Sequence, residues 1–301
     1  MSGSRGERVD RRQVRRHFEA AAGRYDEVAV LQREVADRLL RRLDPVRIEP
    51  ARILDLGAGT GYATDGLLRR YRRAEVHAVD IAPAMLRRAR RAGGWLRRPR
   101  CVCADLQALP YATDTFDLVF SSLALQWADD LTAALAEMQR VTAPGGALML
   151  ATFGPDTLHE LRSAWAEVDD AEHVHRFADK HDIGDAMLAV GFQDPVLDGE
   201  PFSLTYSQPR AVMRDLKALG AANASPERPR GLLSPHRLAQ AEAAYARAWR
   251  QPDGRVPATY EVVYGHAWGR SGVPSASRGG GESAIPVAGI GRRRSGSGGQ
   301  A

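Results

Sequence analysis

The stretch Ile53-Leu54-Asp55-Leu56-Gly57-Ala58-Gly59-Thr60-Gly61 decides the fold of this chain. It predicts a buried strand that runs into a glycine-rich turn and then opens a helix. Glycine has no Cβ, so such a turn lets the backbone approach a ligand closely. A dinucleotide fingerprint needs the spacing G-x-G-x-x-G, but here Tyr62 stands at the third glycine position. No Gly-Lys-Ser/Thr follows, which excludes a P-loop, and Asp55 favours a ligand with a cationic amino-acid end over a pyrophosphate.

Two further carboxylates follow later strands of the same pattern. Asp80 ends the predicted strand 75–80, and Asp105 ends the predicted strand 100–105. Asp80 is placed to accept hydrogen bonds from both hydroxyls of a ribose, and Asp105 from an adenine amino group. Each Asp alone is typical of a helix cap or a turn. Because the carboxyl ends of parallel strands line one crevice, the set together predicts a nucleoside cofactor.

The apolar pattern around these motifs predicts an α/β fold. Short apolar runs alternate with helical stretches, and they show little of the period-two alternation of a half-buried sheet. This favours a mostly parallel sheet with helices on both faces. The predicted strands are 52–57, 75–80, 100–105, 116–122 and 147–153, with later strands at 194–198, 202–206 and 258–268.

Helical segments flank this core on both sides. Residues 10–43 repeat apolar positions at helical spacing, and residues 208–250 do so between the late strands. The C-terminal stretch is rich in Gly, Ser and Arg and is predicted to be mostly disordered. The predicted organisation is an N-terminal helical cap (1–46), a core (47–206), a helical lid insertion (207–255), the last core strand (256–268) and a tail (269–301).

Composition sets outer limits on function. The 301 residues are 44% hydrophobic and carry a net charge of +5, which suggests a polyanion partner. The charge lies at the ends, however: residues 1–16 and 270–301 carry +4 each, which leaves −3 for residues 17–269. No apolar run is long enough for a membrane span, and no secretory signal is visible. Two cysteines without such a signal predict a reducing, cytoplasmic setting.

The glycine motif with its carboxylates resembles class I S-adenosylmethionine-dependent methyltransferases over roughly residues 50–153. The resemblance implies a Rossmann-like core in which the glycine loop wraps the methionine end, Asp80 holds the ribose, and Asp105 with Leu106 faces adenine. Asp55 would act near the methionine amino group, directly or through water. The residues assigned to S-adenosylmethionine in this way are Asp55, Gly57, Gly59, Gly61, Asp80, Ile81, Met85, Asp105, Leu106 and Leu123.

The flanks resemble a narrower family. VDRRQVRRHFEAAAGRYDEVAVLQREVADRLL, SSLALQWADDL, FGPDTLHELRSAW and MRDLKALGAAN are similar to the malonyl-[acyl-carrier protein] O-methyltransferases of biotin synthesis. This resemblance spans about residues 9–268 and implies methylation of the free carboxylate of a malonyl thioester on acyl carrier protein. It assigns Tyr25 and Arg176 to that carboxylate. Because an acidic carrier requires a basic face, we expect docking at Arg210, Arg214 and Lys217, with the arginine run at 87–100 as the second candidate.

Several alternatives stay open at this point. One is another acceptor for the same cofactor, such as a small acid or a quinone precursor. Another is an assembly factor or arginine hydroxylase, because SSLALQWADDL and VPATYEVVYGHAW also resemble respiratory complex I assembly proteins. The acidic body, and the absence of an Asn/Asp-Pro-Pro-Tyr/Phe loop at Ser121-Ser122-Leu123-Ala124, speak against methylation of nucleic-acid bases. The histidine spacing lacks an H-E-x-x-H pattern, so we expect no metal.

Overall fold

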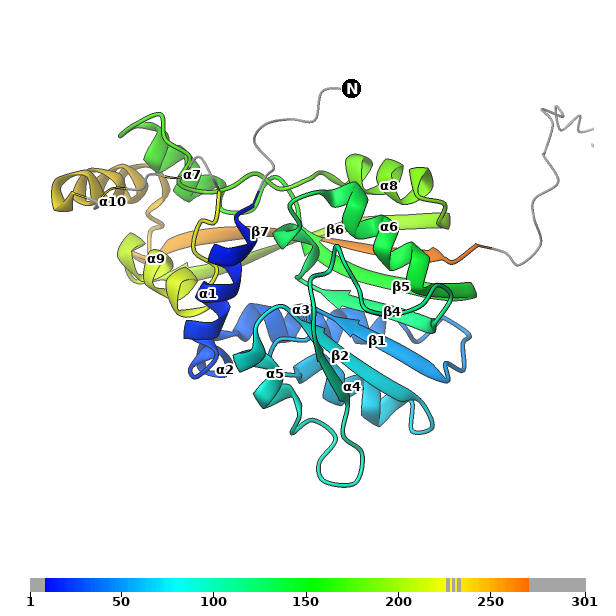
Figure 1. The fold of residues 1–301 in the computed structure, drawn as a ribbon. Coiled ribbons are helices and arrows are strands. Elements are labelled where there is room, and N and C mark those ends of the chain that lie inside the picture. The colour runs from blue at the N-terminus through cyan, green and yellow to red at the C-terminus, as the bar shows by residue number, and fades with distance from the viewer. Residues whose placement is uncertain (1–8, 226–227, 229–230, 232–233, 271–301) are drawn as a thin grey trace, which may run out of the picture. The chain divides into compact units, whose positions relative to one another are not determined.

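A single seven-stranded sheet organises the chain (Figure 1). The computed structural model describes residues 9–225, 228, 231 and 234–270. The strands run in the order β3-β2-β1-β4-β5-β7-β6. The pairs among β1 to β5 are parallel, and β7 is antiparallel to both of its neighbours. The strands are β1 (Arg52–Leu56), β2 (Glu75–Asp80), β3 (Arg100–Cys103), β4 (Phe116–Ser122), β5 (Thr142–Phe153), β6 (Gln193–Tyr206) and β7 (Val256–Trp268).

Helices pack on the sheet and connect its strands (Figure 1). Those before and within the first part of the sheet are α1 (Arg11–Ala21), α2 (Tyr25–Val28), α3 (Val30–Arg41), α4 (Tyr62–Arg70) and α5 (Pro83–Ala89). Those that follow are the short 3₁₀ turn η1 (Leu125–Trp127), α6 (Leu131–Val141), α7 (His159–Ala166), α8 (Lys180–Ala189), α9 (Pro209–Ala218) and α10 (Pro235–Trp249). Both α9 and α10 fall between β6 and β7, where the sequence predicts a helical insertion.

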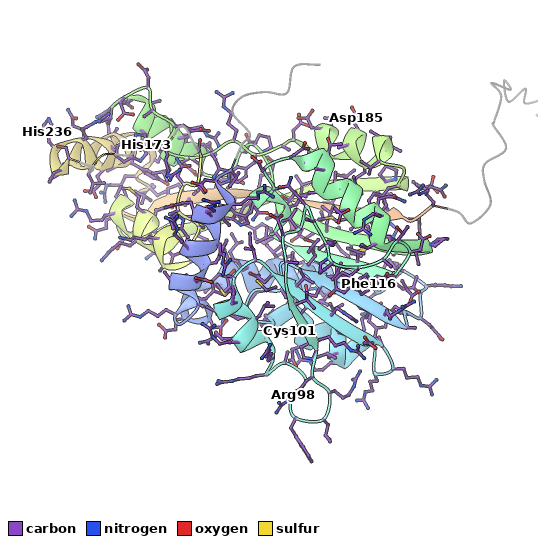
Figure 2. The ribbon with its side chains drawn as sticks, in the orientation of Figure 1. Arg98, Cys101, Phe116, His173, Asp185 and His236 are labelled. Atoms are coloured by element: carbon purple, nitrogen blue, oxygen red, sulfur yellow. The ribbon has the colours of Figure 1, made fainter. Side chains whose placement is uncertain are left out.

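Two apolar cores lie against the sheet. The larger joins α3, α4, α7 and α10 to strand residues such as Ile53 and Phe120. The other joins α6 and α8 to strand residues such as Leu54 and Val119. Neighbouring residues of one strand thus enter different cores, which explains why these strands read as continuous apolar runs. In Figure 2, Phe116 lies among the packed side chains, whereas Arg98 and Asp185 lie at the periphery.

The structure confirms the predicted α/β class and corrects several strand boundaries. The strand predicted at 147–153 begins earlier, at Thr142. The predicted strands 194–198 and 202–206 are one strand, β6, which pairs with β7 from Gln193 to Tyr206 across one register shift. Pro201 does not interrupt β6, because an edge strand needs no N–H donor on its free side. The predicted strand 100–105 ends at Cys103, and Asp105 lies beyond it in an isolated bridge with Ala108.

Some sequence predictions fall outside the described residues. The tail from residue 271 onwards and residues 1–8 are among these. Gly269 and Arg270 are described and still bond to the core, through Gly146 O and Gln139 respectively. Within the described ranges, no helix is long and apolar enough to cross a membrane.

Candidate functional site

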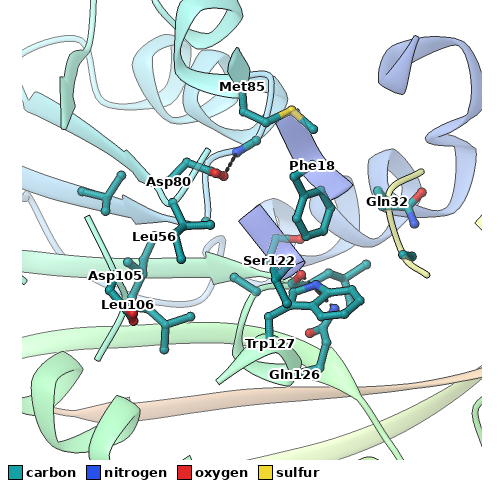
Figure 3. A pocket seen from close by; sticks show the side chains of 18 of the residues that line it. Phe18, Gln32, Leu56, Asp80, Met85, Asp105, Leu106, Ser122, Gln126 and Trp127 are labelled. Atoms are coloured by element: carbon teal, nitrogen blue, oxygen red, sulfur yellow. Dashed lines mark hydrogen bonds between the residues drawn. The ribbon is translucent and has the colours of Figure 1, made fainter. Parts of the chain in front are cut away.

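A cavity opens at the carboxyl ends of β1, β2 and β4 (Figure 3). The strand order reverses between β1 and β4, and open α/β sheets bind ligands at such a reversal. Eight of the ten residues assigned to the cofactor by resemblance line this cavity, here named the first cavity. They are Gly57, Gly59, Asp80, Ile81, Met85, Asp105, Leu106 and Leu123. Asp55 and Gly61 do not line it.

The three glycines of the loop have different surroundings. Each has a positive φ, the region that favours glycine. A Cβ on Gly57 would stand 2.2 Å from Ala124 Cβ, and one on Gly61 would stand 2.7 Å from Ala89 Cα. A Cβ on Gly59 would meet nothing within 4 Å. Gly57 and Gly61 therefore allow close packing within the protein, whereas Gly59, which lines the first cavity, has open space where a Cβ would stand.

Asp80 is held in place by the backbone. Its two carboxylate oxygens accept hydrogen bonds from Gly59 N (2.9 Å) and Ala82 N (2.8 Å). Burial raises the pKa of Asp80 to about 6, and these backbone N–H groups oppose the rise. The carboxylate is thus ionised at neutral pH, and each oxygen keeps capacity for a further donor. Two adjacent hydroxyls are the donor set that such a group can accept.

Asp105 has a partner that the sequence did not indicate. Arg11 of α1 donates a hydrogen bond to Asp105 Oδ2 at 2.7 Å, and Gln107 N donates to Oδ1. Phe18, further along α1, packs edge-on against Trp127 with ring centroids 5.4 Å apart. Helix α1 therefore spans the first cavity from β3 to η1, and Arg11 occupies part of the carboxylate expected to face adenine.

Asp55 lies beneath the glycine loop. It is 1% exposed and accepts a hydrogen bond from Thr64 Oγ1 of α4 at 2.5 Å. Burial raises the pKa of Asp55 to about 7, while the Thr64 hydroxyl opposes the shift. Asp55 does not line the first cavity. The structure therefore does not place it in direct contact with an amino group bound there.

Gln32 of α3 is a lining residue that sequence reasoning missed. Its Oε1 is buried and has no hydrogen-bond partner among the described residues. Such an atom is rare in folded proteins and indicates an absent donor. Figure 3 shows Gln32 and Asp105 on opposite sides, with Asp80 between them. The signal was available, because Gln32 stands three, four and seven residues before the buried Val35, Ala36 and Leu39 of the same helix.

The wall after β4 has an unusual backbone. Leu123 has φ 54°, in the left-handed region that branched residues rarely adopt. Its N–H donates to Ala151 O at 2.8 Å, and its carbonyl accepts from Gln126 Nε2 at 2.8 Å. Gln126 in turn accepts from Thr152 Oγ1. Backbone strain of this kind clusters at ligand sites. Here the hydrogen bonds hold Leu123 in this conformation in the wall of the first cavity.

Helix α2 is tied to the glycine loop. Asp26 accepts from Thr60 Oγ1 and from Arg88 Nη2, each at 2.6 Å. This places Tyr25 in the first cavity, where burial and the nearby charge of Asp80 raise the pKa of its phenol. Tyr25 therefore stays protonated and can donate a hydrogen bond.

A second cavity adjoins the first. It has a volume of about 510 Å³, within the roughly 300–1,000 Å³ usual for small-molecule sites. Trp127, Phe153 and Ala221 line both cavities. Its other walls come mainly from α1, α7, α9 and the segment 173–177. Two ligands bound in these cavities would therefore meet at Trp127 and Phe153.

The structure does not bring Arg176 to Tyr25. Arg176 is exposed and lines neither cavity, but a separate hollow beside Arg162. Its neighbours Val174 and His175 are buried and line the second cavity instead. The segment therefore contributes to the wall of the second cavity, but Arg176 itself lines neither cavity.

The predicted docking cations differ in position. Lys217 is exposed and lines the second cavity, together with the exposed Arg24. Arg214 is exposed on the same helix as Lys217. Arg210 is paired with Glu242 of α10, with Nε–Oε1 at 2.5 Å and Nη2–Oε2 at 3.0 Å. No group of three or more His, Cys, Asp or Glu among the described residues is arranged to hold a metal ion.

The residues that line the first cavity are chemically suited to S-adenosylmethionine. Gly59 leaves free space, Asp80 can accept from the ribose, and the unpartnered Gln32 Oε1 can accept from an ammonium group. Ile81, Met85 and Leu106 supply apolar walls for a purine. The order of Gln32, Asp80 and Asp105 follows the order of methionine, ribose and adenine in that cofactor.

Comparisons with known proteins agree with this geometry. Residues 54–150 match the family described as a methyltransferase domain. Solved structures of similar fold include the YcgJ protein of Bacillus subtilis (TM-score 0.56, 17% identity, covering 79% of this chain and 99% of that one). Another is Haemonchus contortus phosphoethanolamine N-methyltransferase 2 in complex with S-adenosyl-L-methionine (TM-score 0.51, 16% identity, covering 78% and 52%).

A curated relative covers almost the whole chain. The malonyl-[acyl-carrier protein] O-methyltransferase of Halorhodospira halophila is 75% identical over 286 residues, which are 95% of this chain and 97% of that protein. This identity extends through α1 and the insertion between β6 and β7, well outside the generic methyltransferase core. The chain therefore belongs to the malonyl-[acyl-carrier protein] O-methyltransferase family of the class I S-adenosylmethionine-dependent methyltransferases.

Proposed function

We propose that this protein transfers a methyl group from S-adenosylmethionine to the free carboxylate of a malonyl thioester on acyl carrier protein. The product is the methyl ester that primes pimeloyl synthesis for biotin. The observation that carries the proposal is the second cavity, which adjoins the cofactor cavity along Trp127 and Phe153. The name of the 75% identical relative supports the same acceptor.

The acceptor brings its own nucleophile. A carboxylic acid of ordinary pKa is ionised at neutral pH, so no general base has to remove a proton. When bound, S-adenosylmethionine supplies a methyl group on a positively charged sulfur; the new O–C bond forms as the S–C bond breaks, and the electron pair stays on sulfur. The protein therefore has to position one oxygen and exclude water.

The residues between the cavities suit those two tasks. Trp127 and Phe153 form an apolar boundary where the two substrates meet. Tyr25 lies on the cofactor side of this boundary with a protonated phenol, which can donate to a carboxylate oxygen. A neutral donor suits the reaction, because tight pairing of the acceptor with a cation would stabilise the ground state and slow the attack.

The outer end of the second cavity suits an anionic carrier. Lys217 and Arg24 are both exposed and both line this cavity, and Arg214 adds a third exposed cation on α9. Such a surface would attract an acidic protein, and the acyl group that this protein carries would then enter the second cavity. Arg210 is already paired with Glu242, so we expect it to contribute less to docking.

Genetic complementation tests the proposed function. We expect the gene to restore growth without biotin in a strain that lacks its own malonyl carboxyl methyltransferase. Asp80→Ala, which removes the ribose acceptor, serves as the inactive control and should not restore growth. Failure of a soluble, cofactor-binding wild-type protein to restore growth would contradict the proposal and favour another acceptor.

A further inference from the structure

His175 is a buried residue with one ring nitrogen that has no hydrogen-bond partner in the described part of the chain. Its side chain is 7% exposed, and its Nε2 is buried with no hydrogen-bond partner among the described residues. Buried polar atoms in proteins are nearly always paired. Because His175 is also a lining residue of the second cavity, a ligand bound there is a candidate partner for Nε2.

His175 stands where the two cavities meet. It lines the second cavity, and its ring centroid lies 5.3 Å from that of Trp127 and 4.5 Å from that of Phe177. Trp127 itself lines both cavities. A group bound beside His175 in the second cavity is therefore next to the boundary across which a methyl group would pass.

The surroundings keep the imidazole neutral. Burial, and to a smaller extent the charge of Arg162, lower the pKa of His175 to about 4. A neutral imidazole carries one N–H, and with the proton on Nε2 it donates a hydrogen bond to an oxygen. Arg162 places positive potential nearby without reaching the second cavity, because its guanidinium bonds to Pro155 O and Thr157 O.

We propose that His175 binds the methyl acceptor by donating a hydrogen bond from Nε2 to one oxygen of the malonyl carboxylate. This inference rests on the proposed function. The second oxygen is left free to attack, and the imidazole keeps its proton throughout. His175 thereby takes the role that the sequence resemblance assigned to the adjacent Arg176.

Two substitutions separate this role from a packing role. His175→Leu removes the donor, whereas His175→Gln keeps an N–H near the position of Nε2. Hydrogen bonds to a charged group predict a loss of roughly 10- to 100-fold in kcat/KM for malonyl-acyl carrier protein in the Leu variant. We expect the Gln variant to recover most of that loss. Binding of S-adenosylhomocysteine should stay within about threefold of wild type in both.

His266→Leu is the matched control. His266 also has a buried Nε2 without a partner among the described residues, but it lies on β7 and lines neither cavity. We expect this control to keep wild-type kcat/KM. A His175→Leu enzyme with unchanged kcat/KM would overturn the inference, and so would equal losses in the two Leu variants.

The design separates failure of this inference from failure of the proposed function. Wild-type protein that does not methylate malonyl-acyl carrier protein refutes the function itself. If His175→Leu does not fold, the inference is tested instead with the imidazole ¹⁵N spectrum of wild-type protein bound to S-adenosylhomocysteine. A shift of the His175 Nε2 signal on addition of malonyl-acyl carrier protein supports the inference, and an unchanged signal overturns it.

Discussion

Alanine substitution of the glycine loop should separate cofactor binding from folding at single positions. Gly59→Ala introduces a Cβ into free space at φ 54°, so its cost in unfolding free energy is the left-handed strain alone, about 1–2 kcal/mol. Because Gly59 lines the first cavity, we expect the same Cβ to reduce the space for the cofactor. Overpacking of this kind costs about 1–3 kcal/mol, or roughly a five- to hundredfold rise in the Kd for S-adenosylmethionine.

Gly57→Ala provides the contrast. Its Cβ would stand 2.2 Å from Ala124 Cβ, so overpacking adds to the strain and the total loss is about 2–5 kcal/mol. At roughly 2–4 °C per kcal/mol, Tm should fall by several degrees more than in Gly59→Ala. Calorimetric titration and thermal unfolding of the apoproteins measure both effects. Wild-type affinity of Gly59→Ala for S-adenosylmethionine would refute the placement of Gly59 beside the cofactor. An equal fall in Tm in Gly59→Ala and Gly57→Ala would refute it as well.

Three further predictions concern charge and hydrogen bonding. Because the pKa of Asp80 is about 6, cofactor affinity should weaken as pH falls from about 7 to about 5 and the carboxylate is protonated. Asp80→Asn should weaken affinity at pH 7 and make the affinity independent of pH between about 5 and 7. Titration calorimetry at several pH values measures both effects. Gln32→Leu should raise the Kd for S-adenosylmethionine about tenfold without lowering the apoprotein Tm, since it removes a buried oxygen that has no hydrogen-bond partner within the described ranges. A lower Tm with unchanged Kd would mean a structural role. Lys217→Glu should raise KM for malonyl-acyl carrier protein, more at low salt than at high salt, and leave a small malonyl thioester unaffected; equal effects on both substrates would count against docking at α9.

The fold and the cofactor end of the site were predictable from local sequence. The strand-turn-helix at residues 53–61 and the carboxylates after β2 and β3 occupy positions set by backbone geometry. Their placement follows because carboxyl ends of parallel strands share one edge. Gln32 was missed although the signal was present, as a polar residue on the apolar face of a helix.

The acceptor end was less accessible to sequence reasoning. His175 and Arg176 are neighbours in a segment without regular secondary structure, and only His175 lines the second cavity. No helical or strand period in the sequence indicates which of the two faces that cavity. The ion pair between Arg11 and Asp105 joins residues 94 positions apart, so only the packing of α1 across the sheet reveals it. Long-range contacts of this kind lie outside what local patterns encode.

The most direct test of the central claim is the mass of the acceptor after reaction. Purified protein is incubated with S-adenosylmethionine and malonyl-acyl carrier protein, and the intact carrier is measured by mass spectrometry. Acetyl-acyl carrier protein, which has no free carboxylate, is the control. We predict a gain of one CH₂ unit on the malonyl carrier and none on the acetyl carrier. An unchanged malonyl carrier in the presence of cofactor-binding protein would contradict the account.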